Sequence, residues 1–264
     1  MSPEDRGFLF ADGLYEVARA YDGLWFRMDN HLKRLSHGAV FMRFARTEFP
    51  EFAGVADSLL KVNGLTGQNA ILYLEVTRGS APRTHGFPPP TTPLTCMAWV
   101  KPFASKQHHA RDGVPIITTP DIRWARCDVK TIGLTANVLA HQQAIDVGAV
   151  EAVFVRDGFV TEGSHTNVMA VMDGMVVTHP ASHLILEGIT RTAVLELCAQ
   201  SGIPTRMSPM TLPEFQQSQE AFLTGTTGEI TPITSINGVP VASGTPGPVT
   251  RRLQNIFRLL TCGR

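Results

Sequence analysis

The chain has 264 residues, of which 43% are hydrophobic and 17% are charged, and its formal net charge is zero. This composition is typical of a globular protein with material for one large or two modest domains, and it excludes a disordered chain and a basic nucleic-acid surface. No apolar run reaches the roughly 18–20 residues of a membrane span, and the N-terminus lacks the pattern of a secretory signal, so we expect a cytoplasmic protein.

The first hundred residues alternate strands and helices. The expected elements are a hairpin over 14–28, helices over 29–44 and 51–63, and strands over 69–79 and 94–100. Asp22-Gly23 supplies the hairpin turn, Asp29 is the candidate N-cap of the first helix, and Gly64 is the candidate C-cap of the second. The polar stretch 101–113 predicts an irregular linker between two domains.

The rest of the chain is richer in strands. Strands are expected over 114–119, 150–156, 159–162, 166–172 and 174–178, and helices over 135–147, 189–201 and 246–260. Asp-Gly pairs at 157–158 and 173–174 mark turns between neighbouring strands. We therefore predict two domains that both mix helix and strand, over 1–104 and 105–264.

Residues that bind metals elsewhere are scattered here. The four cysteines form no CxxC pair, which favours free thiols in a reducing compartment over disulfides. His108-His109 lies in the polar linker without acidic or cysteine ligands nearby, so solvation is the simpler interpretation. The remaining histidines outside the motifs discussed below are expected to be structural, and no metal site is predicted; they are His31, His37, His141, His179 and His183.

Lys130 stands apart because the chain has only five lysines against eighteen arginines. It lies in CDVKTIGL, between an apolar stretch that looks like a buried strand and the start of a helix. Burial makes an amine a better nucleophile, and such lysines form Schiff bases, most often with pyridoxal phosphate. From this segment alone, a surface lysine at a strand end is the simpler interpretation.

Pyridoxal phosphate needs further groups, and the chain offers a candidate for each. The ring nitrogen requires an acidic partner, and Glu162 follows the strand FVT in TEGSHTN. The phosphate requires N–H groups and hydroxyls, which the helix start Gly188-Ile189-Thr190 and the turn 225–228 can supply. Each feature is weak by itself, because helix starts and turns form without ligands in most proteins.

Together these motifs resemble one family. CDVKTIGL, TEGSHTNV, LILEGITR (184–191) and TGTTGEITPI (224–233) stand in the order and spacing of the class IV, or fold type IV, pyridoxal-phosphate enzymes, and DRGFLFADGLYE (5–16) and HLKRL (31–35) fit as well. The resemblance implies a two-domain α/β (α+β) fold, with a small N-terminal α/β domain and a larger C-terminal β-rich pseudo-barrel domain with flanking helices. It implies these roles: Lys130 as the Schiff-base lysine, Glu162 as the partner of the ring nitrogen, Arg34 as the phosphate arginine, and Leu186, Ile189, Thr190, Thr226 and Thr227 as further contacts of pyridoxal 5′-phosphate.

The loop RGSAPRTHGFP (78–88) bears on the substrate. Arg83 and His85 alternate, so in extended backbone both side chains project from one face and can hold a carboxylate. The loop closely resembles the carboxylate-binding loop of D-alanine (D-amino-acid) aminotransferases. In that subfamily a tyrosine of the DGxYE segment, here Tyr15, joins the pair. The resemblance also implies a homodimer in which Arg83 and His85 reach the site of the neighbouring subunit.

The expected activity is transamination of D-amino acids, such as D-alanine, with a 2-oxo acid acceptor such as 2-oxoglutarate. Fold alone does not separate the members of the family. The alternatives are an aminodeoxychorismate lyase, an (R)-selective amine transaminase, and a pyridoxal-phosphate-binding protein without catalysis. One departure from the family is His165, which stands where a hydroxyl usually follows TEGS. Contact with cofactor or substrate and simple packing both remain open for this residue.

Overall fold

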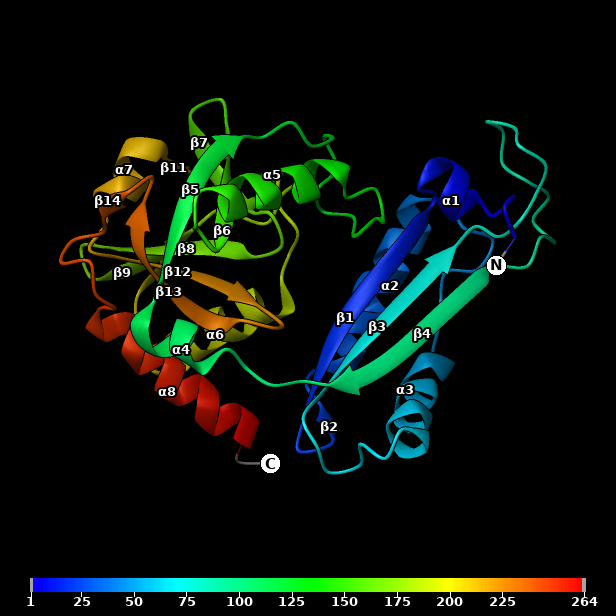
Figure 1. Ribbon diagram of the computed structural model, residues 1–264, viewed down its shortest axis with the longest axis horizontal. Coiled ribbons are helices and arrows are strands. Elements are labelled where there is room, and N and C mark those ends of the chain that lie inside the picture. Colours follow the sequence, from blue (N-terminus) through cyan, green and yellow to red (C-terminus); the bar gives the residue numbers. More distant parts are fainter. Residues whose placement is uncertain (1, 263–264) are drawn as a thin grey trace. The chain divides into compact units, whose positions relative to one another are not determined.

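The computed structural model describes residues 2–262 and divides into two compact units (Figure 1). The first unit comprises the chain up to Ala104 and Val129–Leu134, and the second comprises Ser105–Asp128 and the chain from Thr135 onward. The predicted domain boundary after residue 104 stays a prediction, and the units differ from it in residues 129–134. This segment belongs to the first unit because Thr131 forms an antiparallel bridge with Leu14.

The first unit is an antiparallel sheet of order β2-β1-β3-β4 that packs against two helices. Its elements are α1 (Arg6–Phe10), β1 (Gly13–Tyr21), β2 (Leu24–Trp25), α2 (Met28–Phe41), α3 (Glu51–Val62), β3 (Ala70–Thr77) and β4 (Thr95–Pro102). Leu14 of β1 and Leu74 of β3 share a buried cluster with Leu35 of α2 and Phe52 of α3. Because strand side chains alternate in direction, Tyr15 points to the opposite face of the sheet.

The second unit is built on a sheet of ten strands with order β10-β9-β8-β12-β13-β5-β6-β7-β11, and β14 pairs with β13. Its elements are α4 (Gln107–Asp112), β5 (Val114–Pro120), α5 (Thr135–Asp146), β6 (Glu151–Arg156), β7 (Phe159–Gly163), β8 (Asn167–Met172), β9 (Met175–Thr178), α6 (Ile189–Gln200), β10 (Thr205–Met207), β11 (Met210–Thr211), α7 (Leu212–Gln216), β12 (Glu220–Gly225), β13 (Glu229–Ile236), β14 (Val239–Pro240) and α8 (Pro248–Cys262).

This sheet curls, so that β7 packs against β8 although the two strands are far apart in the strand order. Alternate residues of β8, Val168 and Ala170, enter a core that also contains Val153 of β6 and Leu223 of β12. On the other face of β6, Phe154 packs with α5. Helices α6 and α8 pack on each other and on β12 (Figure 1). The predicted fold class, including the β-rich pseudo-barrel with flanking helices, is confirmed.

The predicted helices and strands are largely present, and four details were wrong. The C-cap of α3 is Asn63 rather than Gly64, which follows it with a positive φ. The N-cap of α2 is Arg27 rather than Asp29, which lies in the first turn where a carboxylate still complements the helix dipole. This helix ends at Phe41, not at 44. The stretch 101–113 is not an irregular linker, because β4 continues to Pro102 and residues 107–112 form α4.

Two properties of the described residues bear on the composition. None of their helices combines the length and the apolar character that crossing a membrane requires. Cys96, Cys127 and Cys198 are free thiols, as predicted, whereas the side chain of Cys262 lies outside the described part of the chain. Burial raises the pKa of both Cys127 and Cys198 to about 11.

Candidate active site

Lys130 lies in the first unit, beside the start of β1. The N–H of Tyr15 donates to the carbonyl of Lys130 at 3.1 Å, which fixes the backbone that carries the amine. The Nζ atom stands 4.1 Å from the centroid of the Tyr15 ring. The segment before the lysine is a turn and not the buried strand that its apolar residues suggest. The structure therefore brings the predicted Schiff-base lysine together with the predicted substrate-binding tyrosine.

Arg34 belongs to a buried ion-pair cluster in the same unit. The carboxylate of Glu16 in β1 accepts hydrogen bonds of 2.7 Å from both Nε and Nη2 of Arg34. The Nδ1 atom of His31 lies 2.8 Å from Oε2 of the same carboxylate. Burial alone raises the pKa of Glu16, but Arg34 and His31 hold it well below its usual range. Burial lowers the pKa of His31, and the charges of Arg34 and Lys130 act in the same direction. The predicted phosphate arginine and Lys130 thus share one neighbourhood.

Glu162 lies in the second unit, near the end of β7, and is almost completely buried. The guanidinium of Arg123 donates to its Oε1. Its Oε2 accepts from Asn167 Nδ2 at 3.1 Å and from Leu186 N at 2.9 Å. Three donors around one carboxylate favour its charged form, which a protonated ring nitrogen requires as a partner. The structure brings Leu186, predicted to contact the cofactor, directly to Glu162.

Arg123 is a member of this site that the sequence did not reveal. Asp121 binds it through two bonds of 2.9 Å, and its guanidinium lies 4.3 Å from the centroid of the Phe154 ring. Burial lowers the pKa of Arg123, but Asp121 and Glu162 outweigh this effect and raise it. The Asp-x-Arg spacing at 121–123 was the available signal, since a short acid–base spacing of this kind allows a bidentate pair.

The N-terminus of α6 provides a cradle for an anion. Its N-cap is Gly188, which has no side chain to cap the first N–H groups, and Ile189 and Thr190 are buried in the first turn. A Cβ on Gly188 would lie 2.0 Å from Asn167 Oδ1, so the close approach of these two segments requires glycine. The first N–H groups of a helix have no partner within the helix, and at the positive end of the helix dipole they are suited to a phosphate.

The second anion-binding candidate is the turn between β12 and β13, and α6 packs against β12. Thr226 is half-buried in this turn, and Thr227 is exposed. Just before them, the hydroxyl of Thr224 is buried and has no hydrogen-bond partner within residues 2–262. A hydroxyl in this state accommodates an additional acceptor such as a phosphate oxygen. The residues present therefore fit the phosphate and ring nitrogen of pyridoxal 5′-phosphate.

The loop with Arg83 and His85 is exposed. Both side chains contact the Phe10 ring of α1, at 5.1 Å from the Arg83 guanidinium and 5.5 Å from the His85 ring, as expected for residues on one face of an extended segment. Arg6 anchors the loop by donating to Thr84 O at 2.8 Å. The aromatic ring that Arg83 and His85 contact is therefore Phe10. Tyr15, the third residue predicted to bind the substrate carboxylate, stacks on Tyr73 and lies beside the Lys130 amine instead.

His165 and His141 lie together, which the sequence spacing did not indicate. Nδ1 of His165 is 3.1 Å from Glu151 Oε2, and Nδ1 of His141 is 3.9 Å from Glu151 Oε1. The expectation that His141 is merely structural missed this arrangement, because the three residues come from separate elements. Burial raises the pKa of Glu151, but the two histidines and Ser164 outweigh this effect and lower it to about 2.

Comparison with known proteins gives a consistent pattern. The profile of the family described as Amino-transferase class IV matches residues 13–236. A D-alanine aminotransferase of Bacillus licheniformis is 40% identical over 259 residues, covering 97% of this chain and 89% of the relative. A D-alanine aminotransferase of Staphylococcus haemolyticus is 39% identical over 258 residues, with coverages of 97% and 91%.

Solved structures resemble the fold over nearly the whole chain. The T.th. branched-chain amino acid aminotransferase with pyridoxamine 5′-phosphate superposes with a TM-score of 0.88 at 27% identity, covering 100% of this chain and 89% of that one. The branched-chain amino acid aminotransferase from Escherichia coli superposes with a TM-score of 0.87 at 24% identity, with coverages of 99% and 88%. At the latter identity the likeness concerns the fold alone.

Proposed function

Because the chain belongs to the class IV aminotransferase family, we propose that it transfers the amino group of D-amino acids, D-alanine among them, to a 2-oxo acid. The observation that carries this proposal is the 40% identity with a D-alanine aminotransferase over 97% of the chain. The predicted family and the predicted cofactor, pyridoxal 5′-phosphate, are confirmed. We take 2-oxoglutarate as the acceptor to test.

The role of Lys130 in this proposal rests on its position over the Tyr15 ring. When bound, pyridoxal 5′-phosphate supplies an aldehyde carbon that receives the amino group and a ring that withdraws electrons from the substrate. The Lys130 amine moves the proton at the substrate α-carbon, first as general base and then as general acid. The Tyr15 ring, 4.1 Å from Nζ, restricts the directions that the amine can take.

Glu162 keeps a proton on the ring nitrogen, and Arg123 acts on this carboxylate as a positioning residue. Phosphate binding is assigned to Arg34, to the first turn of α6 with Ile189 and Thr190, and to the turn containing Thr226 and Thr227. A guanidinium has five N–H donors, so the bidentate pair of Arg34 with Glu16 does not prevent it from binding a phosphate.

The substrate carboxylate is assigned to Tyr15, Arg83 and His85. A charged arginine and an imidazole donor favour an amino acid over a simple amine, which has no carboxylate to fill this site. The exposure of Arg83 and His85, and their contact with Phe10, support a role at the active site of a second subunit in a homodimer. The protein would then have two sites that each require both chains.

The substrate is tested by offering D-alanine, L-leucine, aminodeoxychorismate and an (R)-configured amine without a carboxylate in parallel assays. We expect turnover with D-alanine and 2-oxoglutarate. Turnover of L-leucine alone, pyruvate release from aminodeoxychorismate alone, or turnover of the amine alone would each replace the proposal with the corresponding activity. A chain that binds the cofactor but acts on none of these substrates would be a cofactor-binding protein without this catalysis.

The lysine is tested with Lys130→Ala and with the exposed control Lys61→Ala. We expect turnover to be lost in the first variant and retained in the second. Borohydride reduction followed by peptide mass spectrometry should place the cofactor on Lys130 in the wild type. Attachment to a different lysine would contradict the assignment.

The shared site is tested by subunit exchange. Lys130→Ala and Arg83→Ala chains are each expected to be inactive at low D-alanine concentration. Equal mixing should restore about a quarter of wild-type activity, because half of the dimers combine both chains and each mixed dimer has one intact site. No recovery after demonstrated exchange would place Arg83 in the site of its own chain or outside any site.

A further inference from the structure

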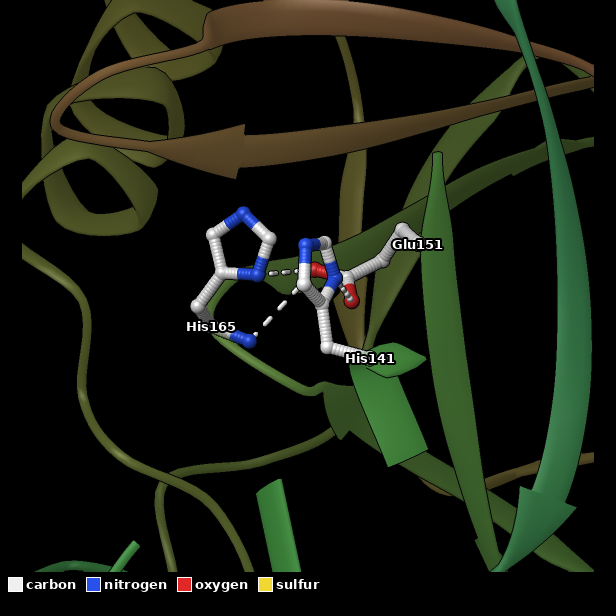
Figure 2. Close-up of side chains that lie close together, drawn as sticks. All are labelled: His141, Glu151 and His165. Carbon is white, nitrogen blue, oxygen red and sulfur yellow. Dashed lines mark hydrogen bonds and ion pairs between the residues drawn. The ribbon is translucent and has the colours of Figure 1, made fainter. Parts of the chain in front are cut away.

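Three side chains of the types that ligate metals converge in the second unit, outside the residues assigned to the cofactor (Figure 2). His141 lies on α5, Glu151 begins β6, and His165 lies in the connection between β7 and β8. Their ligand atoms all lie within 4.8 Å of one another. The centroids of the two imidazole rings are 4.9 Å apart, and the rings are almost perpendicular. Figure 2 shows both Nδ1 atoms directed toward the same carboxylate.

The carboxylate is fixed from behind by the protein. Glu151 is completely buried, and its Oε1 accepts from Ala152 N at 2.9 Å and from Ser164 N at 3.1 Å. Its Oε2 accepts from Thr166 Oγ1 at 2.7 Å. Partners of this kind hold a carboxylate ligand in a fixed orientation.

The Nδ1 atom of His141 gives independent evidence that the cluster binds a ligand. Its Nδ1 is shielded from solvent and has no hydrogen-bond partner among residues 2–262. The distance of 3.9 Å to Glu151 Oε1 is too long for a hydrogen bond. A shielded imidazole nitrogen without a partner is unfavourable unless something binds it, and a metal ion satisfies a nitrogen and a carboxylate at once.

We propose that His141, Glu151 and His165 bind one divalent transition-metal cation of the zinc type. Zinc takes nitrogen and oxygen ligands at about 2.0–2.2 Å, which places two tetrahedral ligands roughly 3.3–3.5 Å apart. The Glu151–His165 distance of 3.1 Å is already close to this value. Both histidine side chains are partly exposed, so small rotations can close the remaining separations. Two imidazoles favour such a cation over Mg²⁺ and Ca²⁺, which prefer oxygen ligands.

The cation would join α5 to the connection that follows Glu162. Asn137 of α5 already donates to Ser164 O at 2.8 Å, so the metal would reinforce an existing contact. Three protein ligands leave a fourth position for water or a small anion. The expected consequence is a more rigid segment around residues 164–166, and the site does not depend on which substrate the enzyme uses.

The test uses the full chain, untagged, loaded with pyridoxal 5′-phosphate and treated with a chelator that is then removed. Titration calorimetry with Zn²⁺ should give one site per chain, and Mg²⁺ at the same concentrations should give none. His141→Ala and His165→Ser should each weaken Zn²⁺ binding by at least about tenfold, since even outer partners of a metal site contribute that much. Co²⁺ should give the intense visible absorption of a tetrahedral site in the wild type but not in these two variants.

The matched control is His37→Ala, which removes an exposed histidine from a helix of the first unit and should leave Zn²⁺ binding unchanged. Zn²⁺ at a hundredfold excess over its dissociation constant should raise the melting temperature of the wild type and this control by about 5–10 °C, but not that of the two cluster variants. Folded variants are identified by unchanged circular dichroism. The proposal is overturned if the wild type binds no Zn²⁺ at millimolar concentration, or if binding persists unchanged in both cluster variants and alters the cofactor spectrum instead.

Discussion

Replacement of Arg123 by alanine should strongly destabilise the second unit. The guanidinium bridges two buried carboxylates, with two bonds to Asp121 and one to Glu162, and only 6% of its side chain is exposed. Removing one partner of a buried ion pair costs about 3–5 kcal/mol, because a charge is left buried without compensation. Arg156 still pairs with Asp121 at 3.1 Å, and Asn167 still donates to Glu162, so we expect the lower end, about 3 kcal/mol.

The assay is urea denaturation at pH 7, with Arg126→Ala as the matched control. Arg126 forms a similar bidentate pair with Asp128, but 38% of its side chain is exposed, so its loss should cost far less unfolding free energy than the loss of Arg123. Burial raises the pKa of Asp121, yet Arg123 holds it below its ordinary value. The ion pair therefore stabilises the folded state at pH values above the ordinary pKa of Asp121, and this stabilisation is lost as the pH falls. The loss of unfolding free energy caused by Arg123→Ala should therefore be smaller at low pH than at pH 7. An Arg123→Ala variant no less stable than Arg126→Ala would refute this reasoning.

Two further predictions concern the cofactor cradle and the cluster at Arg34. Gly188→Ala should weaken binding of pyridoxal 5′-phosphate, measured by absorbance titration, because its Cβ would displace Asn167; the control Gly54→Ala meets no atom within 4 Å and should bind normally. Glu16→Gln should lower the free energy of unfolding at neutral pH by about 3 kcal/mol or more, since it removes the buried carboxylate charge that faces Arg34. The pKa of Glu16 is lowered in the folded state, so its contribution to the free energy of unfolding is present above its ordinary pKa of 4.5 and is lost as the pH falls. In urea denaturation, the stability difference between wild type and Glu16→Gln should therefore be smaller at pH 4 than at pH 7. An equal difference at the two pH values would contradict the assigned pairing.

Local patterns predicted most of the secondary structure because each pattern has a local physical cause. The apolar run of β8, which is buried along almost its whole length, and the Asp173-Gly174 turn follow from hydrophobicity and backbone conformation, which few residues determine. Elements without such a pattern were missed. Strands β11 and β14 have two residues each, too few for a period to be visible. The helix α4 lies in a polar stretch without an apolar face.

Sequence alone determined which chemical groups the protein has, and in what order. A lone lysine at 130, an acidic residue at 162, glycine-rich turns and an Arg-x-His loop were enough to indicate the family, because the order and spacing of such motifs are specific. Tertiary structure decided which of these groups have partners. Arg123 meets Glu162 across 39 residues of chain, and Glu151 lies between two histidines from other elements. Contacts of this kind arise when strands pair and helices pack, and no periodic pattern in the sequence predicts them.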